Sequence, residues 1–383
     1  MKTAKIRILP TKEQREYFAK AFGIRRWTWN WAVAEFFEQA KVDKFPTRFE
    51  LQRQLNNTLV KQAEYAWLSE VNSMVRQEAL ADFGQAVKRY AASRHEAKRR
   101  NEKCDVDKYK PHFKKKGKCS DSFRYSSKGT PLKIVSKKHF TLTTYRGRKP
   151  FSILTTENVW FLRNAKICTA TFSREADQYF VCITYEKTNR KVKQHGAGTV
   201  GLDLGIKHPV VAHDGVSDKI FDLPKSLFEA EKRREHVGRL FSRCEKDSNR
   251  AKRRKLLLEK KYRRENNIKR QFREEISTWL VRNFDLIKID DFQFASTLNL
   301  RHVARALHRV GSYAFKERLK TKAAEYGVEI VVLPKGTPTT QTCSNCGHRS
   351  EKKIELKDRT YICKHCGAVL DRDVNAARNA FKL

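Results

Sequence analysis

The sequence predicts an α/β protein of several domains, and three features of its 383 residues lead to this prediction. Over roughly the first hundred residues, apolar side chains recur at helical spacing, whereas between residues 123 and 185 they alternate as in strands. From residue 198 onward, short apolar strands are separated by long helical stretches. A chain of this length can form roughly two to four domains and bury a sizeable core.

The net charge indicates the kind of partner that the chain binds. Its 82 Lys and Arg residues outnumber 43 Asp and Glu residues, which gives a net charge of +39. So large a surplus repels itself unless a polyanion neutralises it, and nucleic acid is the expected polyanion. The alternatives are RNA binding of the ribosomal type and attachment to an anionic membrane surface.

No part of the sequence is expected to span a membrane, because no segment approaches 18 consecutive apolar residues. The N-terminus also lacks the apolar core of a signal peptide. Five of the nine cysteines are scattered without pattern, so we expect them to be reduced, in a cytoplasmic protein. These five are Cys104, Cys119, Cys168, Cys182 and Cys244.

The first segment begins with a short strand, residues 4–9, which Pro10 ends. Thr11 and Gln14 then have the pattern of a capping box that opens a helix. Apolar positions continue at helical spacing, so we expect a helical bundle over residues 11–100. Its aromatic residues could stack on bases, but their helical spacing favours a place in the core. They are Tyr17, Phe18, Phe22, Trp27, Trp29, Trp31, Phe36 and Phe37.

Residues 94–118 are basic and poor in apolar side chains, which predicts a solvated linker or a loop that becomes ordered on RNA or DNA. The alternating segments that follow are short and separated by turns, one of them at residues 174–177. Regularly spaced short strands of this kind predict a small β-barrel.

The third block contains two apolar strands that each carry a carboxylate. Residues 199–206 form a strand interrupted by Asp203, and residues 286–290 form a strand that ends in Asp290. A helix over 301–326, a strand over 328–333 and a last helix starting at Asp373 or Val374 follow. An Asp in a buried strand is costly unless it binds a proton or a metal, whereas Asp373 could simply cap its helix.

The order strand–Asp, strand–Asp, helix–Asp is that of an RNase H-like fold, whose central sheet brings such carboxylates together. Clustered carboxylates are hard ligands for Mg²⁺, and two such ions can activate water and stabilise the leaving oxygen in phosphodiester hydrolysis. We therefore predict Asp203, Asp290 and Asp373 as catalytic, magnesium-binding residues. The many surrounding Lys and Arg residues are expected to keep all three ionised, as metal binding requires.

Between the two strands lies a strongly basic helical stretch. Residues 252–273 contain eleven Lys or Arg and only two Glu. A helix with so few compensating acids is expected to lie along a phosphate backbone, and the alternative is a solvated surface helix. The predicted nucleic-acid-binding residues are Lys252, Arg253, Arg254, Lys255, Lys260, Lys261, Arg263, Arg264, Lys269, Arg270 and Arg273.

Two CxxC pairs near the C-terminus predict a zinc site. Cys343 and Cys346 are followed, after sixteen residues, by Cys363 and Cys366, a spacing typical of one zinc ion held by four thiolates. Such a closed site is structural because it leaves no coordination position for chemistry. His348 and His365 could act as substitute ligands, but four cysteines already complete the site.

Together these motifs resemble the TnpB family, transposon-encoded RNA-guided DNA nucleases related to the type V CRISPR effectors. The resemblance covers nearly the whole chain, and its last two motifs are highly specific. The motifs are KIRILPTKEQ (5–14), GIRRWTWNWA (23–32), WLSEV (67–71), GLDLGI (201–206), TCSNCG (342–347) and DRDVNAARN (371–379).

The resemblance implies an architecture. A β-barrel wedge domain comprises residues 1–10 and 120–190, and a helical recognition domain with the basic linker, residues 11–119, is inserted in it. A RuvC-like nuclease domain comprises residues 191–337 and 369–383, and a zinc ribbon, residues 338–368, interrupts it.

The resemblance also implies an activity. A guide RNA pairs with one strand of the target double-stranded DNA, the protein reads a short flanking motif, and one magnesium-dependent site cuts. The expected location is the prokaryotic cytoplasm, in association with the nucleoid.

By this resemblance, Asp203 matches the first RuvC carboxylate and Asp373 the third. The second position departs from the family, which usually has Glu then Asp where this chain has Asp290 and Asp291. Because a misplacement of about 1 Å at a catalytic centre costs on the order of 100-fold in rate, two outcomes are open. The chain is an active nuclease, which we expect, or a nuclease-defective RNA-guided DNA-binding repressor. A third hypothesis is a guide-independent nuclease that acts on branched DNA.

Overall fold

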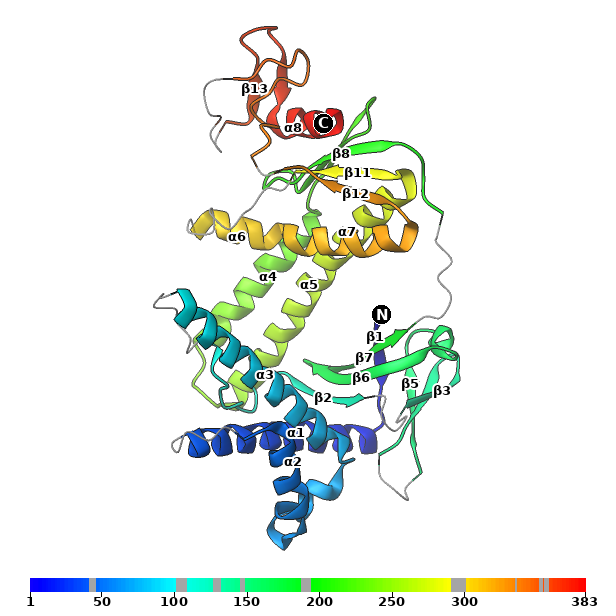
Figure 1. Cartoon of the computed structure of the whole chain (residues 1–383), viewed down its shortest axis with the longest axis vertical. Coiled ribbons are helices and arrows are strands. Elements are labelled where there is room, and N and C mark those ends of the chain that lie inside the picture. The colour runs from blue at the N-terminus through cyan, green and yellow to red at the C-terminus, as the bar shows by residue number, and fades with distance from the viewer. Residues whose placement is uncertain are drawn as a thin grey trace. The chain divides into compact units, whose positions relative to one another are not determined.

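The computed structural model of the protein describes residues 1–40, 46–100, 109–126, 132–144, 149–186, 194–290, 301–334, 336–350, 354 and 358–383. Cys104, Asp291 and residues 101–108 of the basic segment, on which some predictions fall, lie outside these residues. The chain forms two compact units, residues 1–190 and 191–383 (Figure 1). Each unit has its own sheet and its own hydrophobic core, so the prediction of a multidomain α/β protein is confirmed.

The first unit begins with strand β1 (Lys2–Leu9) and continues into helices α1 (Lys12–Ala40), α2 (Arg48–Asn57) and α3 (Met74–Arg100). Two 3₁₀ turns, η1 (Leu59–Lys61) and η2 (Ala63–Glu70), join α2 to α3. The predicted capping box is present: Gln14 N donates to Thr11 Oγ1 at 3.3 Å, and Thr11 N donates to Gln14 Oε1 at 3.1 Å. These bonds satisfy two amides that a helix start otherwise leaves without partners.

A seven-stranded antiparallel sheet completes the first unit, in the order β2-β6-β7-β1-β5-β4-β3. The predicted turn at 174–177 is the tight loop of the β6–β7 hairpin, in which Glu175 pairs with Gln178. The other elements are β2 (Asp121–Ser126), β3 (Leu132–Ser136), β4 (His139–Leu142), β5 (Phe151–Thr155), η4 (Trp160–Leu162), β6 (Lys166–Glu175) and β7 (Gln178–Glu186).

The prediction that this sheet closes into a β-barrel is wrong. Across the described ranges of the first unit, β2 and β3 lie at opposite edges of the sheet and do not pair with each other. Strand β2 is instead tied to helix α3, because Arg124 donates to Glu78 and to Asp82, each at 2.7 Å. Alternation predicts which side chains face the core, but closure depends on contacts between distant segments.

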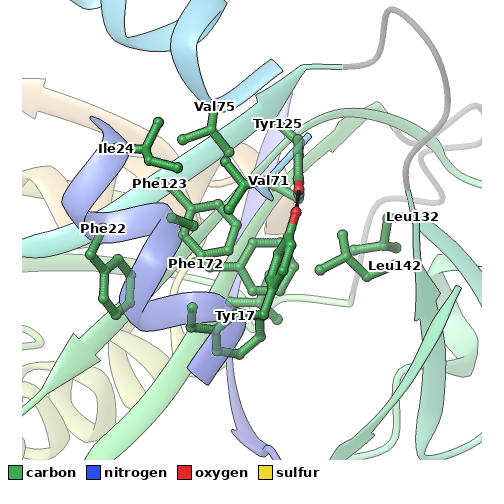
Figure 2. Packing of buried hydrophobic residues seen from close by; sticks show 14 of the residues in the cluster. Tyr17, Phe22, Ile24, Val71, Val75, Phe123, Tyr125, Leu132, Leu142 and Phe172 are labelled. Carbon is green, nitrogen blue, oxygen red and sulfur yellow. Dashed lines mark hydrogen bonds between the residues drawn. The ribbon is translucent and has the colours of Figure 1, made fainter. Parts of the chain in front are cut away.

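Aromatic side chains of α1 pack on the inner face of this sheet. The ring centroid of Phe18 lies 5.5 Å from those of Phe123 and Phe172, and the latter two rings stack at 5.0 Å. The hydroxyls of Tyr17 and Tyr125 share a buried hydrogen bond of 2.8 Å (Figure 2). The eight aromatic residues of α1 are therefore mainly core residues: Tyr17, Phe18, Phe22, Trp29 and Phe36 are buried, and Trp27, Trp31 and Phe37 pack against them.

The second unit is built on a five-stranded mixed sheet in the order β10-β9-β8-β11-β12. Strands β8 (Thr199–Asp203), β9 (Val210–His213) and β10 (Asp218–Phe221) are antiparallel neighbours. Strands β11 (Leu286–Ile289) and β12 (Glu329–Val332) are parallel to β8. Parallel strands end at the same edge of a sheet, so residues that follow β8 and β11 become neighbours.

Helices cover this sheet. Helices α4 (Lys225–Ser242) and α5 (Asn249–Asn283) form a packed pair, and the C-terminal part of α5 contributes Ile276, Leu280 and Val281 to the core. The helix predicted over 301–326 is two helices, α6 (Arg301–Val310) and α7 (Ser312–Tyr326), which separate at Gly311 with φ 67°. The last elements are β13 (Thr360–Ile362), β14 (Val369–Asp371) and helix α8 (Arg372–Lys382).

Hydropathy along the helices agrees with the sequence. Within the described part of the chain, no helix contains a stretch long and apolar enough to cross a lipid bilayer.

Candidate active site and zinc centre

The backbone of helix α8 packs directly against strand β8 because Gly201 has no side chain. A Cβ at Gly201 would lie 2.3 Å from the backbone N of Phe381 and 2.4 Å from the carbonyl oxygen of Ala377. Gly205 leaves room in the same way, since a Cβ there would lie 3.0 Å from Asp373 Oδ2. The helix contributes small buried residues to this contact, namely Ala376, Ala377 and Ala380. The glycines of GLDLGI are therefore explained by the close packing of α8.

This packing gathers the three predicted carboxylates at one end of the sheet. Asp203 is the last residue of β8, and Asp290 directly follows the neighbouring parallel strand β11. Asp373 is the second residue of α8. Asp203 and Asp373 are only 9% and 3% exposed, and Asp290 is half-buried. Two buried carboxylates beside a third are costly in a protein without a compensating cation.

Asp373 does not cap its helix. The N-cap of α8 is Asp371, whose side chain accepts hydrogen bonds from the amides of Asp373 and Val374. The simplest structural explanation for a buried Asp at this position, helix capping, therefore does not apply to Asp373. Its carboxylate is instead paired with Arg372, whose Nη2 lies 3.3 Å from Asp373 Oδ1.

The electrostatics of Asp203 differ from the prediction. Burial raises the pKa of the Asp203 carboxyl well above its ordinary value, and the charges of Asp373 and Asp290 raise it further. Arg372 acts in the opposite direction but does not outweigh them. For Asp203, burial and the two neighbouring carboxylates therefore act on the pKa in the direction opposite to the predicted effect of the surrounding cations. A group of three neighbouring carboxylates, one of them with a raised pKa, is chemically suited to a bound cation.

Two linked hydrogen bonds, which were not predicted from the sequence, hold Asp290. The hydroxyl of Thr339, which is 2% exposed, donates to Asp290 Oδ2 at 2.6 Å. The carbonyl oxygen of Thr339 in turn accepts from Asn379 Nδ2 of α8 at 2.7 Å. Asp290 is thus tied to the helix that carries Asp373. Only the family-like spacing of Asn375 and Asn379 after Asp373 could have pointed to these bonds; Thr339 has no sequence signal.

The four predicted zinc ligands come together in one cluster. Their sulfur atoms all lie within 4.8 Å of one another, with Cys343 and Cys366 3.7 Å apart and Cys346 and Cys363 3.6 Å apart. Across the described ranges, these thiols form the one set of three or more His, Cys, Asp or Glu ligands gathered so tightly. The cluster fits a structural zinc ion with tetrahedral thiolate coordination.

Each half of the zinc centre is a turn with the same hydrogen bonds. In the first, Gly347 N donates to Cys343 O at 2.9 Å; in the second, Gly367 N donates to Cys363 O at 2.9 Å. Both glycines have positive φ, 77° and 71°, a conformation that other residues rarely adopt. Hydrogen bonds from the Ala368 amide and the Asn345 side chain lower the pKa of the Cys366 thiol to about 6. The pKa of the neighbouring Cys346 thiol is raised to about 12, although a backbone hydrogen bond at His348 lowers it, so the four thiols do not all favour the thiolate form without a cation.

The zinc centre is fastened to α8. Asn375 Oδ1 accepts from the amide of Ser344 at 2.8 Å, and Asn375 Nδ2 donates to Thr342 O at 2.7 Å. Asn379 Nδ2 donates to the same Thr342 oxygen at 2.6 Å. Strand β14, which follows the last of the four cysteines, also ends at Asp371, the cap of α8. The metal cluster and the third carboxylate are therefore parts of one rigid assembly.

The predicted basic helix, residues 252–273, is part of α5, and its Lys and Arg side chains differ in exposure. Lys252, Arg253, Arg264 and Arg270 are exposed, and Lys269 is buried. At about 100° per residue, the four exposed residues, with the half-buried Lys260 and Arg263, occupy about a third of the helix circumference. The opposite side carries the buried Ala251, Glu265, Lys269 and Ile276. We call Lys252, Arg253, Lys260, Arg263, Arg264 and Arg270 the α5 stripe.

Lys269 departs from its predicted role. Its ammonium is 2.8 Å from Glu265 and only 7% of its side chain is exposed, so it stabilises the helix pair rather than facing a phosphate. Glu265 also accepts from Arg234 of α4 at 2.6 Å. Burial alone would raise the pKa of Glu265, but the hydrogen bonds from Lys269 and Arg234 lower it below its ordinary value. Arg254 is also engaged internally, donating to the Leu240 carbonyl at 2.6 Å.

Family models match three parts of the sequence: a helix-turn-helix domain over residues 1–44, a probable transposase over 180–301, and a Cas12f1-like TNB domain over 313–380. A TnpB-like protein of Acanthamoeba polyphaga mimivirus, L79, is 34% identical over 136 residues, which are 33% of this chain and 25% of that protein. The chain belongs to the TnpB family. In residues 1–40, the described part of the first match, the structure has strand β1 and the single helix α1.

Two further relatives align over most of the chain. A Streptomyces pristinaespiralis protein, provisionally named an RNA-guided DNA endonuclease, is 29% identical over 98% of this chain and 87% of its own length. InsQ of Escherichia coli K12, with the same provisional name, is 24% identical over 82% of this chain and 75% of its own length. A solved Cas12f1–sgRNA–target DNA complex shares the fold, with a TM-score of 0.60 and 14% identity over 97% of this chain and 83% of that one.

The close contact at Gly201 predicts a local effect of a single methyl group. Gly201→Ala should push α8 away from β8, because overpacking of this kind costs about 1–3 kcal/mol and no side chain is available to yield. Hydrogen exchange followed by mass spectrometry should show faster exchange of the amides in residues 372–382. The control is Gly238→Ala in α4, where the added Cβ would meet only Leu258 Cδ1, at 3.9 Å, and should leave this exchange unchanged. Equal exchange of α8 in both variants would contradict the proposed packing.

The zinc assignment predicts a loss of metal when one thiol is removed. Cys343→Ser and Cys366→Ser should each bind less than one zinc per chain by mass spectrometry of the metal, because a structural zinc site needs all four thiolates. Residues 372–382 should also exchange faster, since α8 is bonded to the zinc centre. Cys244→Ser, outside the cluster, should retain one zinc. Retention of one zinc by both cluster variants would refute the assignment.

Proposed function

We propose that this TnpB-family protein is an RNA-guided DNA endonuclease, which cuts guide-matched DNA beside a short flanking motif by magnesium-dependent phosphodiester hydrolysis. The observation that supports the proposal most directly is the meeting of Asp203, Asp290 and Asp373 at one end of the mixed sheet. The provisional names of the two long relatives agree with it. Among the described residues, neither helix capping nor an ion pair fully explains why these carboxylates are placed together.

The fold supports a RuvC-like, RNase H-like identity for the second unit. Numbered within the unit, its strands have the order 3-2-1-4-5, and strands 1, 4 and 5 are parallel. We assign residues 191–337 and 369–383 to this nuclease domain and residues 338–368 to a zinc ribbon. Residues 1–10 and 120–190 are the wedge domain, as an open sheet, and residues 11–119 are the recognition domain with its basic linker.

The residues of the site fit Mg²⁺. Asp203, Asp290 and Asp373 supply the hard oxygen ligands that it prefers, and Arg372 offsets only part of their charge. Bound Mg²⁺ would supply an activated water and stabilisation of the leaving oxygen. Thr339 orients the Asp290 carboxylate through its 2.6 Å hydrogen bond, and the glycine-mediated contact of α8 sets the distance of Asp373 from Asp203. The burial of Asp203 and Asp373 keeps bulk water away from these ligands.

The proposed partners are a guide RNA and the target double-stranded DNA. The solved Cas12f1 structure contains an sgRNA and target DNA, and the net charge of +39 is suited to long phosphate backbones. The α5 stripe offers such a backbone four exposed cations, Lys252, Arg253, Arg264 and Arg270. In this arrangement base pairing selects the sequence, while the protein binds the shape and charge of the duplex.

The proposal is tested with the protein loaded with the RNA that copurifies with it, after that RNA has been sequenced. Asp203→Ala and Asp373→Ala should lower cleavage of a matched DNA by on the order of 1,000-fold or more, since metal coordination supplies several kcal/mol to the transition state. Binding of the matched DNA should persist. Glu229→Ala, at a side chain that is 65% exposed on α4, is the charge-matched control and should cut normally.

Two results would overturn the proposal. If the unmodified protein binds matched DNA with its guide and Mg²⁺ but leaves it uncut, the repressor is the correct function. If no RNA copurifies and branched DNA is cut without a guide, the guide-independent nuclease is correct.

Asp290→Glu distinguishes an adapted site from a damaged one. Because the Asp290 carboxylate is held by Thr339 and tied to α8, we infer that the site is adapted to the shorter side chain. The longer Glu should misplace a metal ligand by about 1 Å and slow cleavage on the order of 100-fold. Single-turnover cleavage rates at saturating Mg²⁺ measure this effect. A faster rate for Asp290→Glu would mean that Asp is a defect, as in the repressor hypothesis.

The α5 stripe predicts a salt-dependent effect. Arg253→Gln, Arg264→Gln and Arg270→Gln combined should weaken binding of a 20-base-pair RNA–DNA hybrid whatever its sequence. The slope of log affinity against log salt should fall by about 3, roughly one for each phosphate that is no longer neutralised. The combination Lys12→Gln, Lys137→Gln and Lys138→Gln removes the same charge from exposed positions of the first unit and should leave the slope nearer its original value. Equal slopes in the two variants would make α5 an ordinary solvated helix.

A further inference from the structure

One segment of the first unit combines exposed aromatic rings with several lysines. Residues 109–119, the lysine loop, have the sequence YKPHFKKKGKC, with five lysines and no acidic residue. Tyr109 is 48% and Phe113 is 56% exposed, although aromatic side chains stabilise a protein most when they are buried. Lys115, Lys116 and Lys118 are exposed beside them.

The lysine loop is held rigidly by helix α1. The side chain of Asn30 accepts from Lys114 N at 2.7 Å and donates to Lys114 O at 3.0 Å, which fixes the backbone at that residue. Trp29 Nε1 donates to the carbonyl of His112 at 2.9 Å. The Lys114 ammonium lies 3.3 Å from the centroid of the Trp29 ring, a cation–π contact. Phe113 is therefore exposed because hydrogen bonds on both sides of it hold the backbone in one conformation.

The loop borders a hollow large enough for a ligand. The hollow has a volume of about 560 Å³, within the range of ligand clefts. Its walls are Trp29 and Ala86 on one side and the loop residues Tyr109, Phe113, Lys115 and Lys118 on the other. A second hollow of about 400 Å³ lies between Phe37 and residues 110–113, so Phe113 lines both. Aromatic walls with cations at the rim suit a flat base with a phosphate attached.

The charges around the loop favour an anionic ligand. Asp82, whose charge acts on Lys114, is itself bonded to Arg25 at 2.8 Å and to Arg124 at 2.7 Å. Burial and the charge of Arg25 lower the pKa of Lys114 to about 8, so a nearby phosphate would stabilise its protonated form. The exposed lysines of the loop can meet phosphates directly, as single cations do in single-strand binding sites.

We propose that the lysine loop binds an unpaired nucleotide of a nucleic acid strand, with the base stacked on Phe113 and Tyr109 and the adjoining phosphates on Lys115 and Lys118. The inference goes beyond the proposed function and uses only its premise that the chain handles nucleic acid. The strand is RNA or DNA, because both present the same base and phosphate chemistry. A protein partner is disfavoured since three exposed lysines and two rings leave little aliphatic surface for protein packing.

The test uses the full-length, zinc-containing protein and measures binding, so its outcome is independent of whether the protein cuts DNA. The probes are an RNA dodecamer and a DNA dodecamer of uridine or thymidine, each with one 5-iodopyrimidine for crosslinking to aromatic side chains, and a dodecamer with abasic central positions. Crosslinked peptides are identified by mass spectrometry. The proposal predicts adducts on Tyr109 or Phe113, and the probe that yields more of them identifies the strand.

Affinities of variants separate stacking from charge. Phe113→Ala removes the ring on which one base would stack. Its affinity for the base-containing dodecamer should therefore fall on the order of tenfold, and its affinity for the abasic dodecamer should not change. Phe161→Ala, at a ring that is also 56% exposed in the first unit, is the matched control and should lose neither. Lys115→Gln with Lys118→Gln should weaken both probes.

Three results would overturn the proposal. The first is crosslinked adducts confined to other parts of the chain. The second is an equal loss of affinity in Phe113→Ala and in Phe161→Ala. The third is that Phe113→Ala loses as much affinity for the abasic probe as for the base-containing probe. The first two would remove the lysine loop as a site, and the last would reduce it to a charged surface. None of them bears on Asp203, Asp290 or Asp373, so a failure here is distinguishable from a failure of the nuclease proposal.

Discussion

The contact between helix α8 and strand β8 is the constraint on which the second unit depends. Two glycines, Gly201 and Gly205, remove the side chains that would keep the helix away, and α8 presents alanines to them. The contact places Asp373 beside Asp203, at the price of burying two carboxylates. That cost appears as the raised pKa of Asp203. A fold that only needed a packed core would avoid this cost, and this is why we propose a cation site at these carboxylates.

The zinc centre has a mechanical role in this arrangement. Through Asn375 and Asn379 it holds the first turns of α8, and through β14 it delivers the chain to Asp371, the helix cap. Thr339, which precedes the zinc ligands, holds Asp290. The segment that carries the four cysteines thus fixes the two carboxylates that do not belong to β8. Zinc ribbons of this size have little hydrophobic core of their own, so metal coordination supplies their rigidity.

The positive charge of the chain is divided between two uses. Some cations are internal: Lys269 and Arg234 neutralise Glu265, and Arg309 is bonded to Glu231 at 2.9 and 3.0 Å. Such buried pairs mainly avoid the cost of an unpaired charge when helices pack together. The exposed cations form separate surfaces, the α5 stripe in the second unit and the lysine loop in the first. Cations at such surfaces are available to a polyanion, whereas the internal ones are not.

The sequence by itself determined the features that depend on neighbouring residues. The capping box of Thr11 and Gln14, the hairpin at 174–177, the CxxC turns and the carboxylates on apolar strands all follow from local spacing and backbone preference. Only the tertiary structure decided that the first sheet stays open, that Asp371 rather than Asp373 caps α8, and that Lys269 faces inward. It also decided that Thr339 and Asn379 support Asp290. Each of these results depends on residues far apart in the chain, whose contacts are selected by packing of the whole unit and leave no periodic signal in the sequence.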